Sequence, residues 1–440
     1  MQISLFIAAA ALVPAAASPM AKPAPPTATA QIHGRAVAAA VRKLLDANYV
    51  LPETRPKFDA VLDKGIASGR YDVADPDRLV ELINQDLHQV TPDKHLHVMH
   101  DPERSKDLAA AAPGAGADDA PPTAEEIADA QRRNSGLVQM RILPGNIRYL
   151  ETDGFVWAGD VTERAYDDAM RFLAGGDAVI IDMRRNGGGS PAAVRYLVSH
   201  FLAPNTPLMT FYMGATRIDT TAAMPKTIAP RMVGKPLYVL TSGGTASAAE
   251  EFTGHVAGYK LGELVGENTA GAGFRNEFYP LPDGMVISIS VGRAILASTG
   301  KGWEGVGFAP NSKSELANAL DVAEAHALKQ LASTASPDKR RGLEGQAAML
   351  LAKVTPVKTA LPLAAYSGVY GPRTVTVVDG ALTIERQGGS TSKLVAIEPN
   401  TFAYENDPGS TVTFDVAGDQ ATALHLLRAD GSTDDGTRAR

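Results

Sequence analysis

Two short apolar runs constrain the fold of this chain more than any other feature. The segments "AVIID" (178–182) and "PLYVL" (236–240) each lead through glycine-rich sequence into a helical pattern. Runs of this length, bounded by turn residues, are typical of buried strands. Strand and helix patterns alternate in this way over residues 136–335. The alternation predicts an α/β core whose mainly parallel sheet is covered on both faces.

Different patterns flank the α/β segment. Residues 31–100 repeat apolar positions at helical spacing and predict a small N-terminal helical domain. Residues 101–135 are rich in Ala, Asp, Gly and Pro and predict a flexible connection. Residues 361–435 alternate polar and apolar positions, with Asp379-Gly380 as a hairpin signal, and predict a small C-terminal antiparallel β-barrel domain.

We expect the α/β core to contain its own sheet and helices. A chain beginning at Thr123 would then fold without the N-terminal domain.

Composition excludes several classes of function. The 440 residues are 45% hydrophobic and 21% charged, which suits a soluble globular protein of two or three domains. A net charge of -7 without a Lys or Arg run argues against nucleic acid as a partner. With no cysteine, the chain has neither a thiol nucleophile nor a disulfide.

The first residues predict export. Residues 1–17, "MQISLFIAAAALVPAAA", are apolar, end in small residues and are too short to span a bilayer. This pattern is typical of a secretory signal peptide, although it lacks the basic start. It predicts a periplasmic or secreted protein.

Ser247 lies in "TSGGTASAAEEF", where an apolar strand has ended and a helix begins. The free N–H groups and positive dipole end of a helix start would favour an oxyanion beside this hydroxyl. The same serine forms a capping-box pattern with Glu250, worth about 1 kcal/mol and no chemistry. The segment alone leaves both interpretations open.

A second loop, "RRNGGGS", follows the strand at 178–182. Its three glycines can expose backbone amides to a carbonyl oxygen. The G-x-G-x-x-G spacing is missing and no Walker lysine follows, so the loop does not predict a nucleotide site. A simple tight turn is the alternative.

A serine hydroxyl needs a base, and histidine is the usual one. Four of the nine histidines fall within thirteen positions: His88, His95, His97 and His100. In an extended segment His95 and His97 share one face, so alternation does not separate them. The H-x-H pattern also suits zinc, but Met99 replaces the acidic residue of the H-x-H-x-D-H motif, and we expect no metal and no cofactor. Glu304 could orient a histidine or be a solvated charge.

Six segments, in order, resemble the S41 family of serine peptidases, in the branch with tricorn-type peptidases and interphotoreceptor retinoid-binding protein modules. They are "NYVLPE", "DLHQVTPDKHLHV", "IIDMRRNGGGS", "GKPLYVLTSGGTASAAEEF", "LVGENTAGAG" and "EGVGFAP", between about residues 31 and 330. The resemblance implies a ClpP/crotonase-like spiral of β-β-α units for the core.

The resemblance also implies residue roles. Ser247 matches the nucleophile, His95 the histidine of the D-x-H motif, and Glu304 the acidic residue before the G-V-x-x-P turn. The oxyanion hole would combine the amides of Ala248 and Gly188.

The sequence departs from the C-terminal-processing members of the family in two ways. Ala272 occupies the position of their lysine base, and residues 101–144 are too few for their PDZ domain. The base must then come from the N-terminal domain, with His97 as a rival to His95.

Three functions follow. The first is an exported serine peptidase that hydrolyses peptides or unfolded chains through an acyl-enzyme. The second is a non-catalytic protein on the same fold that binds an apolar ligand or a peptide. The third is an interaction module carried by the C-terminal barrel. The serine, histidine and glutamate together favour the first.

Overall fold

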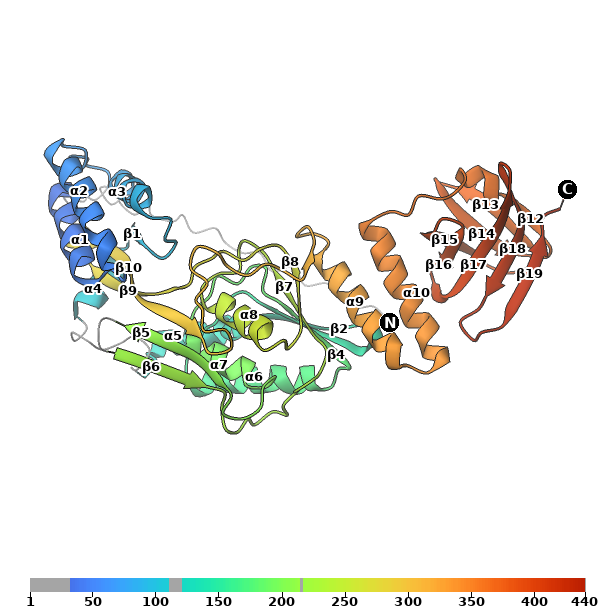
Figure 1. Cartoon of the computed structure of the whole chain (residues 1–440), viewed down its shortest axis with the longest axis horizontal. Helices are drawn as coiled ribbons and strands as arrows, with labels where there is room; N and C mark the ends of the chain where they lie inside the picture. The colour runs from blue at the N-terminus through green and yellow to red at the C-terminus, as the bar shows by residue number, and fades with distance from the viewer. Residues whose placement is uncertain (1–31, 111–120, 214–216, 440) are drawn as a thin grey trace, which may run out of the picture.

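The computed structural model describes residues 32–110, 121–213 and 217–439. The N-terminal helices, the α/β core and the C-terminal barrel follow one another along the long axis of the molecule (Figure 1). The predicted signal peptide, residues 1–17, lies outside the described residues. None of the helices in the described ranges combines the length and apolarity that crossing a membrane requires.

The elements have the following bounds. The helices are α1 (Gly34–Asn48), α2 (Arg55–Ala67), α3 (Pro76–Val90), α4 (Pro102–Ala110), α5 (Ala124–Arg132), α6 (Asp160–Ala174), α7 (Pro191–Val198), α8 (Ala248–Gly258), α9 (Ala319–Thr334) and α10 (Pro337–Val354). The strands outside the barrel are β1 (His97–His100), β2 (Leu137–Leu143), β3 (Ile147–Thr152), β4 (Ala178–Asp182), β5 (Pro207–Met213), β6 (Arg217–Ala222), β7 (Leu237–Thr241), β8 (Glu263–Gly266), β9 (Phe274–Pro280), β10 (Met285–Leu296) and β11 (Ser312–Lys313). The barrel strands are β12 (Gly368–Tyr370), β13 (Arg373–Val378), β14 (Ala381–Arg386), β15 (Thr391–Glu398), β16 (Thr401–Tyr404), β17 (Asp407–Ala417), β18 (Gln420–Leu427) and β19 (Thr433–Thr437).

The predicted parallel sheet forms the centre of the molecule. Its strand order is β11-β8-β7-β4-β3-β2, and every pairing is parallel except β2 with β3. Helices α6, α7 and α8 pack on one face, and α9 packs on the other with α10 against its outer side. Because both faces are covered, all five residues of β4 and of β7 are buried. The α/β prediction is confirmed.

Helix ends follow the local sequence signals. Asp75 caps α3, its Oδ1 accepting from the N–H groups of Asp77 at 2.9 Å and Arg78 at 3.3 Å. Ser190 caps α7 through its hydroxyl, which accepts from the Ala192 N–H at 3.2 Å, and Pro191 occupies the first helical position. These ends are local, so the sequence alone specifies them.

The stretch between the N-terminal domain and the core contains two helices. Helix α4 packs on β9, where the Arg104 guanidinium lies 3.6 Å from the centre of the Phe278 ring. Helix α5 begins at a complete capping box between Thr123 and Glu126. The expected flexible connection over 101–135 is therefore wrong for these two helical stretches.

The N-terminal helices share one apolar core with the β9–β10 hairpin. Strand β1 pairs with β10, and four residues of the hairpin region are buried among α1, α2 and α3: Leu281, Met285, Ile287 and Ile289. Exposing four such side chains would cost about 6–12 kcal/mol, as much as the whole stability of many domains. This packing argues against the expectation that a chain beginning at Thr123 folds alone.

The C-terminal part is a nearly closed antiparallel barrel with its own core. Strands β12 to β19 pair in sequence order, and a bridge between Tyr370 and Arg438 joins the first strand to the end of the chain. The predicted hairpin joins β13 and β14, with positive φ at Asp379 (48°) and Gly380 (77°). Helix α10, which was not predicted from the sequence, lies between the core and the barrel (Figure 1).

Replacing Ile287 by alanine tests the shared core. We expect the free energy of unfolding to fall by about 2–5 kcal/mol, because a fully buried side chain leaves a cavity between β10 and the N-terminal helices. Val138→Ala, at a position that is 48% exposed on β2, is the matched control and should change it by less than about 0.5 kcal/mol. Equal effects in urea unfolding would contradict the shared core.

Candidate active site

Ser247 occupies a strained turn between β7 and α8. Its backbone angles are φ 54° and ψ -120°, a conformation that residues with a side chain rarely adopt. Such strain costs on the order of 1–3 kcal/mol and persists only where the surroundings impose it. The side chain is half-buried at the first turn of the helix.

The neighbouring glycine-rich loop helps to impose this turn. The Thr245 hydroxyl donates to the Met183 carbonyl at 2.8 Å, and the Ala246 N–H donates to the Asn186 carbonyl at 3.1 Å. The two loops at the ends of β4 and β7, found separately in the sequence, are thus hydrogen-bonded together beside Ser247.

Gly188 lies directly against Ser247. A Cβ atom at Gly188, where φ is 109°, would be 2.7 Å from the Ser247 Cβ, so only glycine fits. The Gly188 N–H, however, donates to Asn186 Oδ1 at 2.9 Å. The expectation that this amide is available to an oxyanion is therefore wrong for this structure, because Asn186 already engages it.

The Ala248 N–H is better placed for such a role. Ala248 is the first residue of α8, and a first-turn amide has no acceptor within its own helix. Among the hydrogen bonds of the described residues, this N–H donates to none. It lies 3.0 Å from where a Cβ on Gly188 would be, on the side where the two loops meet.

Glu250 connects the serine turn to a third loop, residues 269–273. Its fully buried carboxylate accepts from the Ser247 N–H at 3.1 Å, the Thr269 hydroxyl at 2.6 Å, and the N–H groups of Gly271 at 2.6 Å and Ala272 at 2.7 Å. A buried carboxylate is tolerated when donors satisfy it in this way. Glu250 and Ser247 thus also form the expected capping box at the start of α8.

The third loop continues directly to Glu304. Glu304 Oε2 accepts from the N–H groups of Gly273 at 2.6 Å and Phe274 at 2.9 Å. A Cβ on Gly273 would be 2.4 Å from the Glu304 nitrogen, so glycine is required there. Burial raises the pKa of Glu304 to about 7, nearby Asp93 adds to the rise, and the two backbone donors oppose it. Glu304 is a perturbed, partly buried acid rather than a solvated charge.

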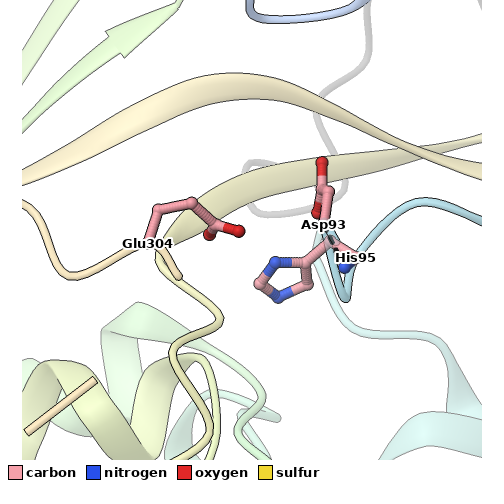
Figure 2. A group of neighbouring side chains, drawn as sticks. All are labelled: Asp93, His95 and Glu304. Carbon is pink, nitrogen blue, oxygen red and sulfur yellow. Dashed lines mark hydrogen bonds between the residues drawn. The ribbon is translucent and has the colours of Figure 1, made fainter. Parts of the chain in front are cut away.

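His95 lies in the bend before β1 and faces Glu304 (Figure 2). Ligand atoms of Asp93, His95 and Glu304 all lie within 4.8 Å of one another. The backbone N–H of His95 donates to Asp93 Oδ1 at 2.9 Å, and the Tyr49 hydroxyl donates to Asp93 Oδ2 at 3.1 Å. The His95 Nδ1 atom is buried and has no hydrogen-bond partner among the described residues.

The protonation of His95 suits a base. Burial lowers the pKa of His95, Asp93 opposes this effect and His97 adds to it. The imidazole is therefore neutral near pH 7, as a group that accepts a proton must be.

His97 lies elsewhere. It belongs to β1, pairs with Ser288 on β10, and has His88 and Arg104 among its charged neighbours. The expectation that His95 and His97 share the face of one strand is wrong, because β1 begins only at His97. The structure brings His95, and not His97, to Glu304.

Sequence reasoning missed two residues of this site. Asp93 was visible as the first residue of the D-x-H motif, but its burial beside Glu304 was not. Glu250 was considered only as a helix cap. The Lys94 ammonium adds a further contact, donating to the Ala270 carbonyl and so holding the His95 bend against the third loop.

Two family models match the chain. The model of peptidase family S41 matches residues 146–314, and the model of the N-terminal domain of S41 peptidases in eukaryotic IRBP matches residues 29–140. The chain belongs to peptidase family S41, a family of serine peptidases.

Curated relatives match over shorter stretches. The chain is 29% identical over 145 residues to the carboxyl-terminal-processing protease of Synechocystis sp., which covers 32% of this chain and 33% of that protein. It is 33% identical over 116 residues to the chloroplastic C-terminal processing peptidase of Tetradesmus obliquus, which covers 26% of this chain and 24% of that protein. The match thus spans about a third or less of each relative's length.

Two solved protease structures are also similar. The photosystem II D1 C-terminal processing protease has a TM-score of 0.42 at 17% identity, covering 64% of this chain and 94% of that one. The tricorn protease has a TM-score of 0.42 at 13% identity, covering 64% of this chain and 34% of that one. The family assignment rests on the sequence matches.

Replacing Glu250 by glutamine tests its link to the serine. An amide cannot accept all four hydrogen bonds, so we expect the free energy of unfolding to fall by about 2–4 kcal/mol and Ser247 to react at least about tenfold more slowly with a fluorophosphonate. The rate is measured per folded molecule. Glu251→Gln is the matched control, since Glu251 is also buried but contacts His255 instead. A Glu250→Gln protein that labels at the wild-type rate would contradict the link.

The raised pKa of Glu304 predicts a pH dependence. If the ionised carboxylate orients the neutral His95, labelling of Ser247 should rise with pH to a plateau above about pH 7. Glu304→Gln should remove this rise and lower the plateau. The free energy of unfolding should change in the opposite direction. The raised pKa of Glu304 in the folded protein contributes stability that is fully present below pH 4.5, the pKa of a glutamate in the unfolded chain. This contribution is lost as the pH rises through about 7. Urea unfolding of both proteins from pH 5 to pH 8 checks the sign.

Proposed function

We propose that this protein is a serine peptidase whose nucleophile is Ser247, whose base is His95 and whose orienting acid is Glu304. One observation carries the proposal. One loop, residues 269–273, donates hydrogen bonds to both Glu250 and Glu304. Glu250 holds the Ser247 turn, and Glu304 faces His95. The three groups come from distant parts of the chain, yet one hydrogen-bonded loop supports them all.

In the proposed reaction, the Ser247 hydroxyl attacks a peptide carbonyl while His95 takes its proton. The charge on the tetrahedral intermediate falls on the carbonyl oxygen, beside the Ala248 N–H. His95 then protonates the leaving amine, and water, deprotonated by His95, hydrolyses the acyl-enzyme. Glu304 stabilises the imidazolium at both stages.

The proposed substrates are peptides or unfolded protein chains. The curated relatives are named for the processing of carboxyl termini. In this chain the position of the lysine base of C-terminal-processing peptidases is Ala272, which is buried, donates to Glu250 and accepts from Trp303. A histidine base from the N-terminal domain therefore suits this chain better than a lysine from the core.

A binding function is the second candidate. The N-terminal match to the domain found in eukaryotic IRBP favours it, and the ligand would be an apolar molecule or a peptide. The perturbed acid beside a neutral histidine favours hydrolysis, because a binding protein has no need of either group.

We also infer that the core follows a ClpP/crotonase-like spiral and that the protein is exported. The succession β2–β3–α6 is a β-β-α unit of the kind such a spiral repeats. The apolar residues 1–17 support export to the periplasm or the medium. Amino-terminal sequencing of protein from the native host would check export, with Ser18 as the expected first residue.

A fluorophosphonate probe tests the proposed function. Wild-type protein should be labelled, and Ser247→Ala should not be, while the free energy of unfolding falls by no more than about 1 kcal/mol, the worth of a lost helix cap. In subtilisin, a serine peptidase, loss of the nucleophile costs on the order of 10^6-fold in turnover. His95→Ala should label at least about a thousandfold more slowly, and His97→Ala should remain close to wild type. Labelling that survives in Ser247→Ala would contradict Ser247 as the nucleophile. Labelling that only His97→Ala abolishes would contradict His95 as the base.

A further inference from the structure

Asp93, His95 and Glu304 form a compact set of donor atoms at the junction of two domains. One nitrogen and two carboxylate oxygens lie within 4.8 Å of one another, and Figure 2 shows the His95 ring facing Glu304 with Asp93 beside it. Asp93 is buried, with 1% of its surface exposed, whereas His95 and Glu304 are partly exposed. The H-x-H pattern considered from the sequence would have used His95, His97 and a third nearby histidine, and of these only His95 belongs to this set.

Electrostatics favour a cation in this space. Carboxylate oxygens of Asp93 and Glu304 lie within 4.8 Å of each other, so the two groups repel each other when both are ionised. The nearest basic residue in sequence, Lys94, directs its ammonium to the Ala270 carbonyl rather than between them. A cation between the carboxylates would relieve the repulsion.

A second observation is independent of the charges. The His95 Nδ1 atom is buried and lacks a hydrogen-bond partner among the described residues, although Figure 2 shows one ring nitrogen facing Glu304. An unpartnered buried nitrogen requires an explanation. A neutral imidazole nitrogen is a preferred ligand of Zn²⁺, whereas Mg²⁺ and Ca²⁺ prefer sites made of oxygen.

We propose that Asp93, His95 and Glu304 reversibly bind a divalent zinc ion. One imidazole nitrogen and two carboxylates match the ligand types that zinc takes in proteins. With bonds of about 2.0–2.1 Å in a tetrahedral site, the ligand atoms would lie roughly 3.3 Å apart. The group therefore has to contract modestly, and the His95 bend and the Glu304 turn, both on loops, allow this.

Zinc at this site inhibits the peptidase, a consequence that rests on the proposed function. A neutral imidazole has one nitrogen that accepts and one that carries a proton. With the metal on Nδ1, the proton stays on Nε2, so His95 cannot take a proton from Ser247. The metal also occupies Glu304. Chelators should therefore release activity rather than abolish it.

Zinc binding is measured first, by calorimetry on the Ser247→Ala protein, which separates binding from catalysis. We expect one site per chain. His95→Ala and Glu304→Gln, each added to Ser247→Ala, should weaken it at least about tenfold, while His97→Ala, the matched control, should not. Thermal melting confirms that each variant is folded. Absence of zinc binding, or binding that survives both substitutions, overturns the proposal.

Inhibition is measured second, as fluorophosphonate labelling of Ser247 in the wild-type chain. Zinc should slow labelling, EDTA should restore it, and Mg²⁺ should have no effect. Zinc binding without any slowing of labelling overturns inhibition. If the metal-free protein is not labelled at all, the proposed peptidase function fails, while the zinc site is still decided by calorimetry.

Discussion

The buried carboxylate of Glu250 is the interaction on which the rest of the site depends. It accepts one hydrogen bond from the backbone N–H of Ser247, in the strained turn, and three from donors of the loop at residues 269–273. A charge with no exposure is stable only when donors surround it, so the two segments are held in one arrangement. Releasing the strain at Ser247 would remove one of the four donors of this carboxylate, so Glu250 helps to maintain the strained turn.

The site is also a product of domain packing. His95 and Asp93 belong to the N-terminal domain, whereas Ser247 and Glu304 belong to the α/β core. The β9–β10 hairpin joins the two, because its apolar face completes the core of the N-terminal helices. The hairpin starts at the loop that donates to Glu304, so the packing of the helices and the position of the acid are linked.

Two acids and a histidine in one compact, partly buried group allow more than one chemistry. Each carboxylate has directed donors, from the Tyr49 hydroxyl for Asp93 and from backbone amides for Glu304, yet neither accepts from the buried Nδ1 atom of His95. The ring is thus oriented by its backbone and its surroundings rather than by a hydrogen bond at this nitrogen. Proton transfer and metal binding compete for the same imidazole.

Local patterns in the sequence determined the buried strands β4 and β7, the caps at Asp75 and Ser190 and the β13–β14 hairpin, because each depends on a few neighbouring residues. Six ordered segments also indicated the peptidase family. Only the tertiary structure decided that His95 rather than His97 faces Glu304, that Asn186 engages the Gly188 amide, and that Asp93 and Glu250 belong to the site. Asn186 and Gly188 are only two residues apart, and their contact depends on the conformation of the loop. The other outcomes depend on partners far apart in the chain, whose positions are set by the packing of whole domains.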